Sequence, residues 1–138
     1  MSDDSVQEIG PEQIDAILNY LPLFEREGYQ FGQWVTHEGQ FPFILLTAEV
    51  DEFIATLYEQ NILVQFDWTS SIDQVERYQS DPDALGEADL LTLRKLLTAH
   101  VRADRFVEGH LAGALQSGHI TAILRCIKRI RGKTAGST

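Results

Sequence analysis

The apolar residues in the second half of the chain recur at helical spacing, and this periodicity most constrains the fold. Residues 88–103 contain a stripe of four such residues, widened by two more leucines: Leu90, Leu93, Leu97 and Val101, with Leu91 and Leu96. Apolar residues three and four positions apart give an α-helix one face that has to be buried. A helix of this kind needs other elements to cover it, so the pattern predicts a packed helical fold.

The same periodicity predicts helices elsewhere in the chain. One begins at Gly10-Pro11 and breaks at Pro22, because proline fits the first turn of a helix but not its interior. Another follows Thr47, which can cap a helix whose first turns are acidic, and it ends at Asn61. Further helices are expected at the four ranges 71–79, 88–103, 104–117 and 119–131. Gly118 is expected to end the third of these as its C′ residue.

Two connectors lack helical periodicity and are rich in aromatic residues. Residues 28–46 mix tyrosine, phenylalanine and tryptophan with glycine and proline, which predicts an irregular segment with a short extended piece. Residues 62–68 alternate apolar and polar side chains and predict an extended connector rather than a strand with a partner. The expected fold class is therefore mostly α, a compact irregular bundle of about five or six helices with aromatic-rich connectors.

Length and composition indicate one domain. The chain has 138 residues, of which 43% are hydrophobic and 23% charged, values typical of a globular protein. We expect a flexible leader over residues 1–9, a single helical domain over 10–131 and a disordered tail over 132–138.

The single cysteine, Cys126, excludes an intrachain disulfide and fits a reducing compartment. The acidic first residues do not resemble a secretory signal peptide, and no apolar stretch reaches the length of a membrane span. The sequence thus predicts a cytoplasmic protein with no membrane association.

The net charge of −10 is unevenly distributed along the chain. Residues 1–120 carry all 21 acidic side chains and six basic ones, a net of −15, whereas residues 121–138 carry five basic side chains and no acid. An acidic body repels a phosphate backbone, so direct nucleic-acid binding is not expected. The basic last helix either meets an anionic partner or lies against the acidic body of its own chain.

The residues around the expected junction at 102–109 form the densest cluster of charge. Two arginines and two acids can form a paired network there that fixes the angle between two helices: Arg102, Arg105, Asp104 and Glu108. Alternatively, Arg102 and Arg105 can clamp a small anion at the start of the next helix. Gly109 and Gly113 lie four residues apart and predict close packing on one helix face.

None of the four histidines indicates a catalytic or metal site by its spacing. His37, His100, His110 and His119 include no pair at a metal-binding interval, and no cofactor is expected. His110 and His119 could converge across the turn at Gly118. His100 follows Leu96 and Leu97, so a hydrogen-bonded core or boundary histidine is favoured over a general base.

Two tryptophans, Trp34 and Trp68, are candidates for pocket walls or partner anchors, although core packing is the commoner fate of such side chains. The candidate binding residues taken together are Trp68, Arg102, Arg105, Glu108 and His110. No residues are assigned as catalytic.

Several short motifs resemble a bacterial and archaeal family of small proteins known as domain of unknown function 6508. They are Phe66-Asp67-Trp68, Asp81-Pro82, Ala88-Asp89-Leu90, Leu96-Leu97-Thr98, Arg102-Ala103-Asp104-Arg105-Phe106-Val107-Glu108-Gly109, Gly118-His119-Ile120 and Ile123-Leu124-Arg125. The resemblance covers roughly residues 45–130 and is most specific at residues 102–109. Ser71 stands where the family pattern has a second tryptophan, which weakens any pocket that this tryptophan would line. The resemblance implies no particular activity.

Three functions remain open at the level of the sequence. The favoured one is a non-enzymatic protein-interaction or accessory module, which binds another protein or forms a homodimer, since no residues assemble into reaction chemistry. The second is an acidic inhibitor that occupies a partner's nucleic-acid-binding groove. The third is a small-anion-binding protein or enzyme that uses Arg102 and Arg105. Enzymatic activity is left open, and its absence is favoured.

Overall fold

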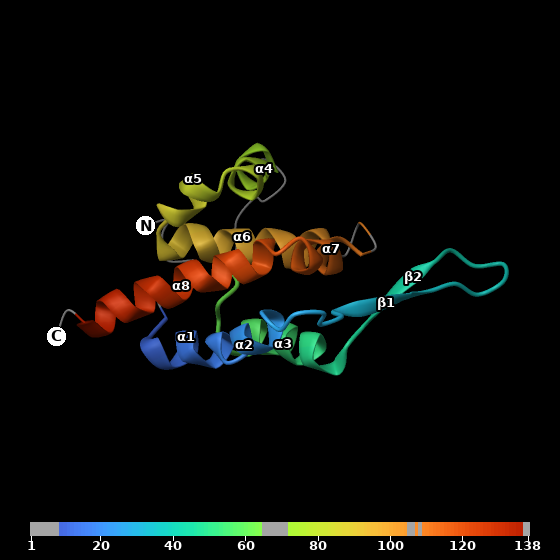
Figure 1. The fold of residues 1–138 in the computed structure, drawn as a ribbon, viewed down its shortest axis with the longest axis horizontal. Helices are drawn as coiled ribbons and strands as arrows, with labels where there is room; N and C mark the ends of the chain where they lie inside the picture. Colours follow the sequence, from blue (N-terminus) through green and yellow to red (C-terminus); the bar gives the residue numbers. More distant parts are fainter. Residues whose placement is uncertain (1–8, 65–71, 105–106, 108, 137–138) are drawn as a thin grey trace.

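The chain is mostly helical, as the periodicity predicts (Figure 1). The computed structural model describes residues 9–64, 72–104, 107 and 109–136. Its helices are α1 (Pro11–Leu18), α2 (Leu21–Phe24), α3 (Ala48–Glu59), α4 (Ile72–Ser80), α5 (Pro82–Gly86), α6 (Leu90–Ala103), α7 (His110–Gln116) and α8 (His119–Gly136). Its strands are β1 (Gly32–Val35) and β2 (Phe43–Leu46). Among the described helices, none combines the length and apolar character that a membrane span needs.

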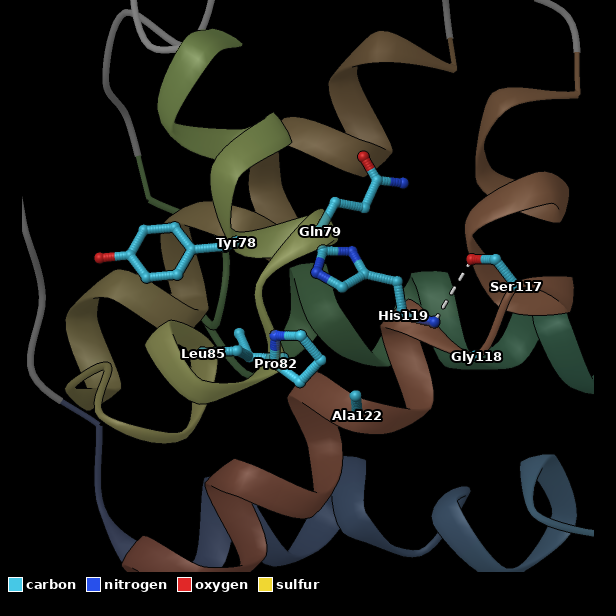
Figure 2. Close-up of a pocket in the computed structure, with 8 residues that line it drawn as sticks. All are labelled: Tyr78, Gln79, Pro82, Leu85, Ser117, Gly118, His119 and Ala122. Atoms are coloured by element: carbon cyan, nitrogen blue, oxygen red, sulfur yellow. Dashed lines mark hydrogen bonds between the residues drawn. The ribbon is translucent and has the colours of Figure 1, made fainter.

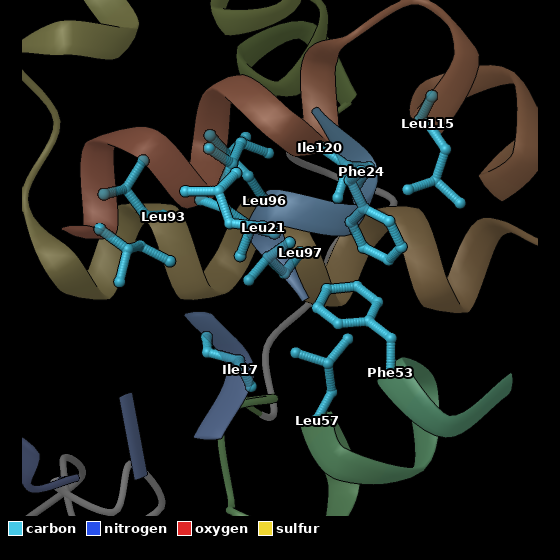
Figure 3. Close-up of a cluster of buried hydrophobic side chains, with 14 of the residues drawn as sticks. Ile17, Leu21, Phe24, Phe53, Leu57, Leu93, Leu96, Leu97, Leu115 and Ile120 are labelled. Carbon is cyan, nitrogen blue, oxygen red and sulfur yellow. The ribbon is translucent and has the colours of Figure 1, made fainter. Parts of the chain in front are cut away.

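Helices α6 and α8 form the centre of the fold. They pack against each other, with α1, α2 and α3 on one side and α4 and α5 on the other (Figure 1). The predicted stripes of both helices are buried there, with Leu93, Leu97 and Ile123 fully enclosed. Phe24 and Phe53 meet edge to face beside them, with ring centroids 5.1 Å apart (Figure 3). Burial of these apolar faces holds the bundle together.

Local capping explains where several helices begin. The Thr47 hydroxyl accepts a hydrogen bond from the backbone N–H of Val50 at 3.3 Å, so the predicted cap is confirmed. The Asp89 carboxylate accepts from the N–H of Thr92 at 2.8 Å and starts α6. Hydrogen bonds from Thr92 lower the pKa of Asp89, because they stabilise its charged form.

The first aromatic connector is more ordered than the sequence predicts, because part of it forms an antiparallel hairpin. β1 pairs with β2, so that Trp34 lies opposite Ile44 and Val35 opposite Phe43. The hairpin extends away from the helices (Figure 1). At its root the side chain of Phe31 is buried, and the backbone N–H of Thr47 donates to the Phe31 carbonyl at 3.0 Å.

Arg94 holds the second connector against α6. The residue is only 4% exposed, and its guanidinium group donates to the carbonyls of Ile62 at 2.9 Å and Asn61 at 2.8 Å. The N–H of Val64 donates to the Thr98 hydroxyl at 3.0 Å. Residues 62–64 thus form the expected extended connector with its apolar side buried, whereas residues 65–68 lie outside the described residues.

Three helix boundaries differ from the sequence prediction. The break expected at Pro22 comes earlier, because α1 ends at Leu18 and Pro22 lies in the first turn of α2, where proline is tolerated. The expected helix over 104–117 begins only at His110, because Asp104 ends α6 and Gly109 adopts a left-handed φ of 83°. The Asp104 carboxylate instead accepts from the N–H of Leu111 at 3.0 Å and caps α7. Helix α8 continues to Gly136, past the predicted boundary at residue 131, since a lone glycine at 132 does not stop a helix.

The basic face of α8 lies partly against the acidic body of its own chain, one of the two arrangements that the sequence left open. Arg125 pairs with Glu25 at 2.6 Å, and Arg131 makes two hydrogen bonds with Asp15 at 3.1 and 3.2 Å. These pairs fasten α8 to α1 and to the segment that follows α2. Their solvent exposure keeps each contribution to stability small.

Candidate functional site

Three histidines from consecutive helices form a hydrogen-bonded chain in the body of the protein. His100 of α6 lies in the middle and is fully buried. Its Nδ1 is 3.1 Å from Nε2 of His110 on α7, and its Nε2 is 2.9 Å from Nδ1 of His119 on α8. His110 is partly exposed and His119 is buried, so the chain runs from near the surface into the interior.

The two buried rings are uncharged at neutral pH. The pKa of His100 is lowered to about 3, chiefly by desolvation on burial and to a smaller extent by charge repulsion from His119 and His110. Burial also lowers the pKa of His119, an effect that the backbone of Tyr78 partly opposes. Neither ring therefore carries the positive charge that would attract an anion.

Because a neutral imidazole has one N–H donor and one acceptor nitrogen, the chain has two consistent arrangements. In one, His110 donates to His100, which donates to His119, and the Nε2 of His119 carries a proton. In the other, every donor and acceptor is exchanged, and the Nε2 of His119 is an acceptor. The state of this innermost nitrogen is thus coupled to that of His110.

His119 borders a hollow of about 260 Å³ between α8 and the α4–α5 segment (Figure 2). Its walls are mostly apolar, with Tyr78, Pro82, Leu85 and Ala122, and its polar side chains besides His119 are Gln79 and Ser117. The Ser117 hydroxyl accepts from the N–H of His119 at 3.4 Å and fixes the first residue of α8. The residue lines the hollow, but the Nε2 of its ring is itself buried.

Within the part of the chain that the structure describes, the Nε2 of His119 is the one buried side-chain nitrogen or oxygen without a hydrogen-bond partner. The backbone of Tyr78 is close enough to raise the pKa of this ring, but it does not reach hydrogen-bond geometry. An unsatisfied buried polar atom is costly, by about 1–3 kcal/mol, and needs an explanation.

The arrangement does not suit a metal ion. Four of the six ring nitrogens already bond to one another, so the three rings do not converge on a common point. Among the described residues, no group of three or more histidine, cysteine or acidic side chains is arranged to hold a metal. The chemistry that remains for the chain is hydrogen bonding and the transfer of protons along it.

A second candidate surface is the hairpin, whose aromatic and aliphatic side chains face solvent. Phe41 in its loop is 93% exposed, Leu45 on β2 is 60% exposed, and Trp34 on β1 is 54% exposed. One edge of the Trp34 ring lies against Gly109, where a Cβ atom would be 2.5 Å from the indole. This contact fastens the root of the hairpin to the junction between α6 and α7.

Comparison with known proteins identifies the family. A family model described as a family of unknown function, DUF6508, matches residues 9–133. The chain belongs to the DUF6508 family. The match covers nearly the whole polypeptide, including the hairpin and the three hydrogen-bonded histidines. Comparisons with curated proteins and with solved structures found no match.

The sequence-predicted binding residues of this DUF6508 protein are only partly described. Trp68, Arg105 and Glu108 lie outside the described residues. Arg102 is half-buried at the end of α6, and no ion pair joins it to another described residue. His110 is the outer member of the histidine chain. Whether these five residues form a binding site therefore stays a prediction.

Sequence reasoning missed the histidine chain as a unit. It allowed His110 and His119 to meet across the Gly118 turn, but in the structure both contact His100 instead. The favoured prediction of a hydrogen-bonded core histidine is confirmed for His100. The sequence did contain one signal. His100 lies beside a strongly apolar stripe, so its ring is expected to be buried, and a buried polar side chain needs hydrogen-bond partners.

Two other predictions from the sequence were wrong. Trp34 is not a core residue, because it lies on the hairpin and only its edge touches the body. Gly113 does not permit close packing, since nothing lies within 4 Å of the position that its Cβ would take. Of the glycine pair, Gly109 alone accommodates a neighbour.

Proposed function

We propose that this DUF6508 protein is a protein-interaction module and that the β1–β2 hairpin is its contact surface. The observation that carries the proposal is the exposure of Phe41 and Leu45, 93% and 60%, on an arm that extends from the helices (Figure 1). Large apolar side chains that are exposed together on one arm commonly mark a binding site.

Both faces of the hairpin are apolar. The register places Trp34 and Ile44 on one face, and Val35 and Phe43 on the other. A two-stranded hairpin gains little stability in water by itself, so its apolar residues are poorly accounted for by folding alone. The contact between Trp34 and Gly109 orients the arm in advance, which reduces the entropy lost on binding.

Charge indicates the kind of partner. The hairpin carries one charged side chain, Glu38, and α3 follows with Glu49, Asp51 and Glu52, all exposed. The expected partner is therefore a different protein with an apolar groove rimmed by basic residues. A second copy of this chain is less suitable, since it would bring the same acidic residues together. Basic residues that line a nucleic-acid-binding groove also meet this description.

The test compares capture by the wild-type chain with capture by the double variant Phe41→Ser/Leu45→Ser. A protein captured from a lysate of the source cell is accepted as a partner only if it meets two conditions. The double variant has to fail to capture it, and the purified partner has to bind the purified wild-type chain. That binding is expected to weaken at least tenfold in the double variant and to weaken further with added salt. The matched control is Val107→Ser, which removes an exposed apolar side chain outside the hairpin.

Two outcomes contradict the proposal. Capture that is equal for wild-type protein and double variant would remove the hairpin as the contact surface. The second outcome is measured by light scattering on the purified chain alone. A dimer of the wild type that is lost in the double variant would mean that the hairpin binds a second copy of this chain and not a basic partner.

A further inference from the structure

A second hollow, of about 290 Å³, lies where the first turn of α8 meets the end of α7 and the segment that follows α2. The accessible part of its lining is mostly polar, whereas that of the hollow beside His119 is mostly apolar. Its polar groups come from parts of the chain that are about 90 residues apart in sequence, at 25–29 and 116–125. What this hollow binds is a question separate from the partner of the hairpin.

Thr121 of α8 presents a hydroxyl group to this hollow. The residue is 6% exposed, and its hydroxyl forms no hydrogen bond with any other residue that the structure describes. The hydroxyls of Thr56 and Thr98, by contrast, donate to the carbonyl four residues earlier in their helices. The Thr121 oxygen is not sealed from solvent, since it is absent from the buried unpartnered atoms of the described chain. The small exposed part of Thr121 therefore includes a hydroxyl that is available to a ligand.

The first turn of α8 adds a backbone donor at the same place. The N–H of Thr121 has no acceptor among the described residues, because the carbonyl of Gly118 accepts instead from Ala122 at 2.9 Å. Gly118, which lines the hollow, has no side chain that could cap the helix. The N-terminus of an 18-residue helix carries a partial positive charge and unpaired N–H groups, which together favour an anion.

The charged side chains of the lining leave one cation unbalanced. Arg125 is paired with Glu25 at 2.6 Å. Arg26 is exposed and forms no ion pair or hydrogen bond with another described residue. The three charged residues of the lining thus sum to +1, in a chain whose net charge is −10. A guanidinium group without an acidic partner is well suited to a phosphate or carboxylate group.

We propose that this hollow binds a small oxyanion, a phosphate or carboxylate group, at the first turn of α8. Its oxygens would accept hydrogen bonds from the hydroxyl and the N–H of Thr121, and the guanidinium group of Arg26 would balance its charge. A water molecule has a share of about 30 Å³ in the liquid, so a hollow of about 290 Å³ also accommodates the part of a molecule that carries the anionic group. This site is distinct from the clamp that the sequence predicts at Arg102 and Arg105.

Titration of the full-length chain with inorganic phosphate, followed by ¹H–¹⁵N NMR, tests the proposal. Sodium chloride keeps the ionic strength constant and serves alone as the control. Phosphate is expected to shift the amide resonances of Gly118 and Thr121 to saturation, and chloride is not. Sodium acetate in a parallel titration identifies the group: the same shifts with acetate would indicate a carboxylate ligand, and shifts with phosphate alone a phosphate ligand.

Two variants locate the binding, each with a matched control. Thr121→Val keeps the shape of the side chain without its hydroxyl and should weaken phosphate binding about tenfold, since hydrogen bonds to charged groups are strong. Arg26→Gln should weaken it about threefold to tenfold. Thr36→Val and Arg77→Gln make the same changes at exposed positions outside the hollow and should leave phosphate binding unaltered. The comparison of phosphate with chloride stands even if Thr121→Val fails to fold.

Three outcomes would overturn the proposal. Phosphate shifts that do not exceed those of chloride would mean that only water occupies the hollow. Undiminished binding in folded Thr121→Val would place the phosphate elsewhere on the protein. Equal losses in Arg26→Gln and Arg77→Gln would mean general attraction to surface arginines and not a site.

Discussion

Acid should destabilise this protein through His100, and the size of the effect follows from the burial of its ring. The pKa of His100 is lowered from 6.5 to about 3 in the folded chain. The unfolded chain therefore binds one more proton than the folded chain between these two values. The free energy of unfolding depends on this difference, so it falls as the pH falls through the window from 6.5 to 3.

The magnitude can be worked out for a modest change of pH. For one histidine with an unfolded pKa of 6.5, lowering the pH from about 7.5 to about 5.5 reduces the free energy of unfolding by about 1.4 kcal/mol. This value depends little on the folded pKa, because the buried ring stays unprotonated at pH 5.5 for any folded pKa near 3. The lowered pKa of His119 adds to the loss in the same direction.

Urea unfolding followed by tryptophan fluorescence at the two pH values measures the loss. The variant His100→Gln removes the central ring and should reduce the pH dependence by about 1.4 kcal/mol, whatever its own stability. The matched control is His37→Gln, which makes the same change in the exposed hairpin loop and leaves the histidine chain intact.

Equal pH dependence in the wild type and in His100→Gln would refute the reasoning. If the variant does not fold, an NMR titration of the wild-type rings gives the same information. A His100 ring that gains its proton near pH 6 would show that burial does not keep it neutral.

Two further substitutions test the contacts that hold the connectors. Arg94→Met leaves two main-chain carbonyls without their buried donor and should lower the free energy of unfolding by about 1–3 kcal/mol. The control Arg77→Met changes an exposed arginine and should cost little. Equal losses in urea unfolding would contradict the role assigned to Arg94. Gly109→Ala should destabilise by about 1–3 kcal/mol, because φ is positive and its Cβ would clash with Trp34. Gly113→Ala should stabilise α7 by about 0.5–1 kcal/mol, and thermal melts that rank the two glycine variants in the opposite order would show the geometry to be wrong.

The sequence alone determined most of the helices and several of their ends. The stripe that contains Leu93 and Leu97 predicts α6 because helical periodicity depends on residues three and four positions apart. Thr47 predicts the start of α3 for the same local reason, since a cap bonds only to the next turn. Gly118 adopts the predicted left-handed conformation, with φ of 88°.

The boundary of α7 shows where local reasoning ends. Asp104 looks like the start of a helix, but its carboxylate caps a turn that begins six residues later at His110. The left-handed conformation of Gly109 accompanies the approach of Trp34, a residue far away in sequence. A long-range contact therefore selected between two starts that the local sequence allows.

Only the tertiary structure decided the candidate site. His100 is separated by 10 and 19 residues from the histidines that it contacts, and the three rings meet because α6, α7 and α8 pack at particular angles. The hollow beside His119 likewise depends on where the α4–α5 segment lies against α8. Periodicity records which face of each helix is buried, but not which polar side chains face one another once those faces are joined. Those pairings follow from packing geometry, and the unpartnered nitrogen of His119 is a consequence of it.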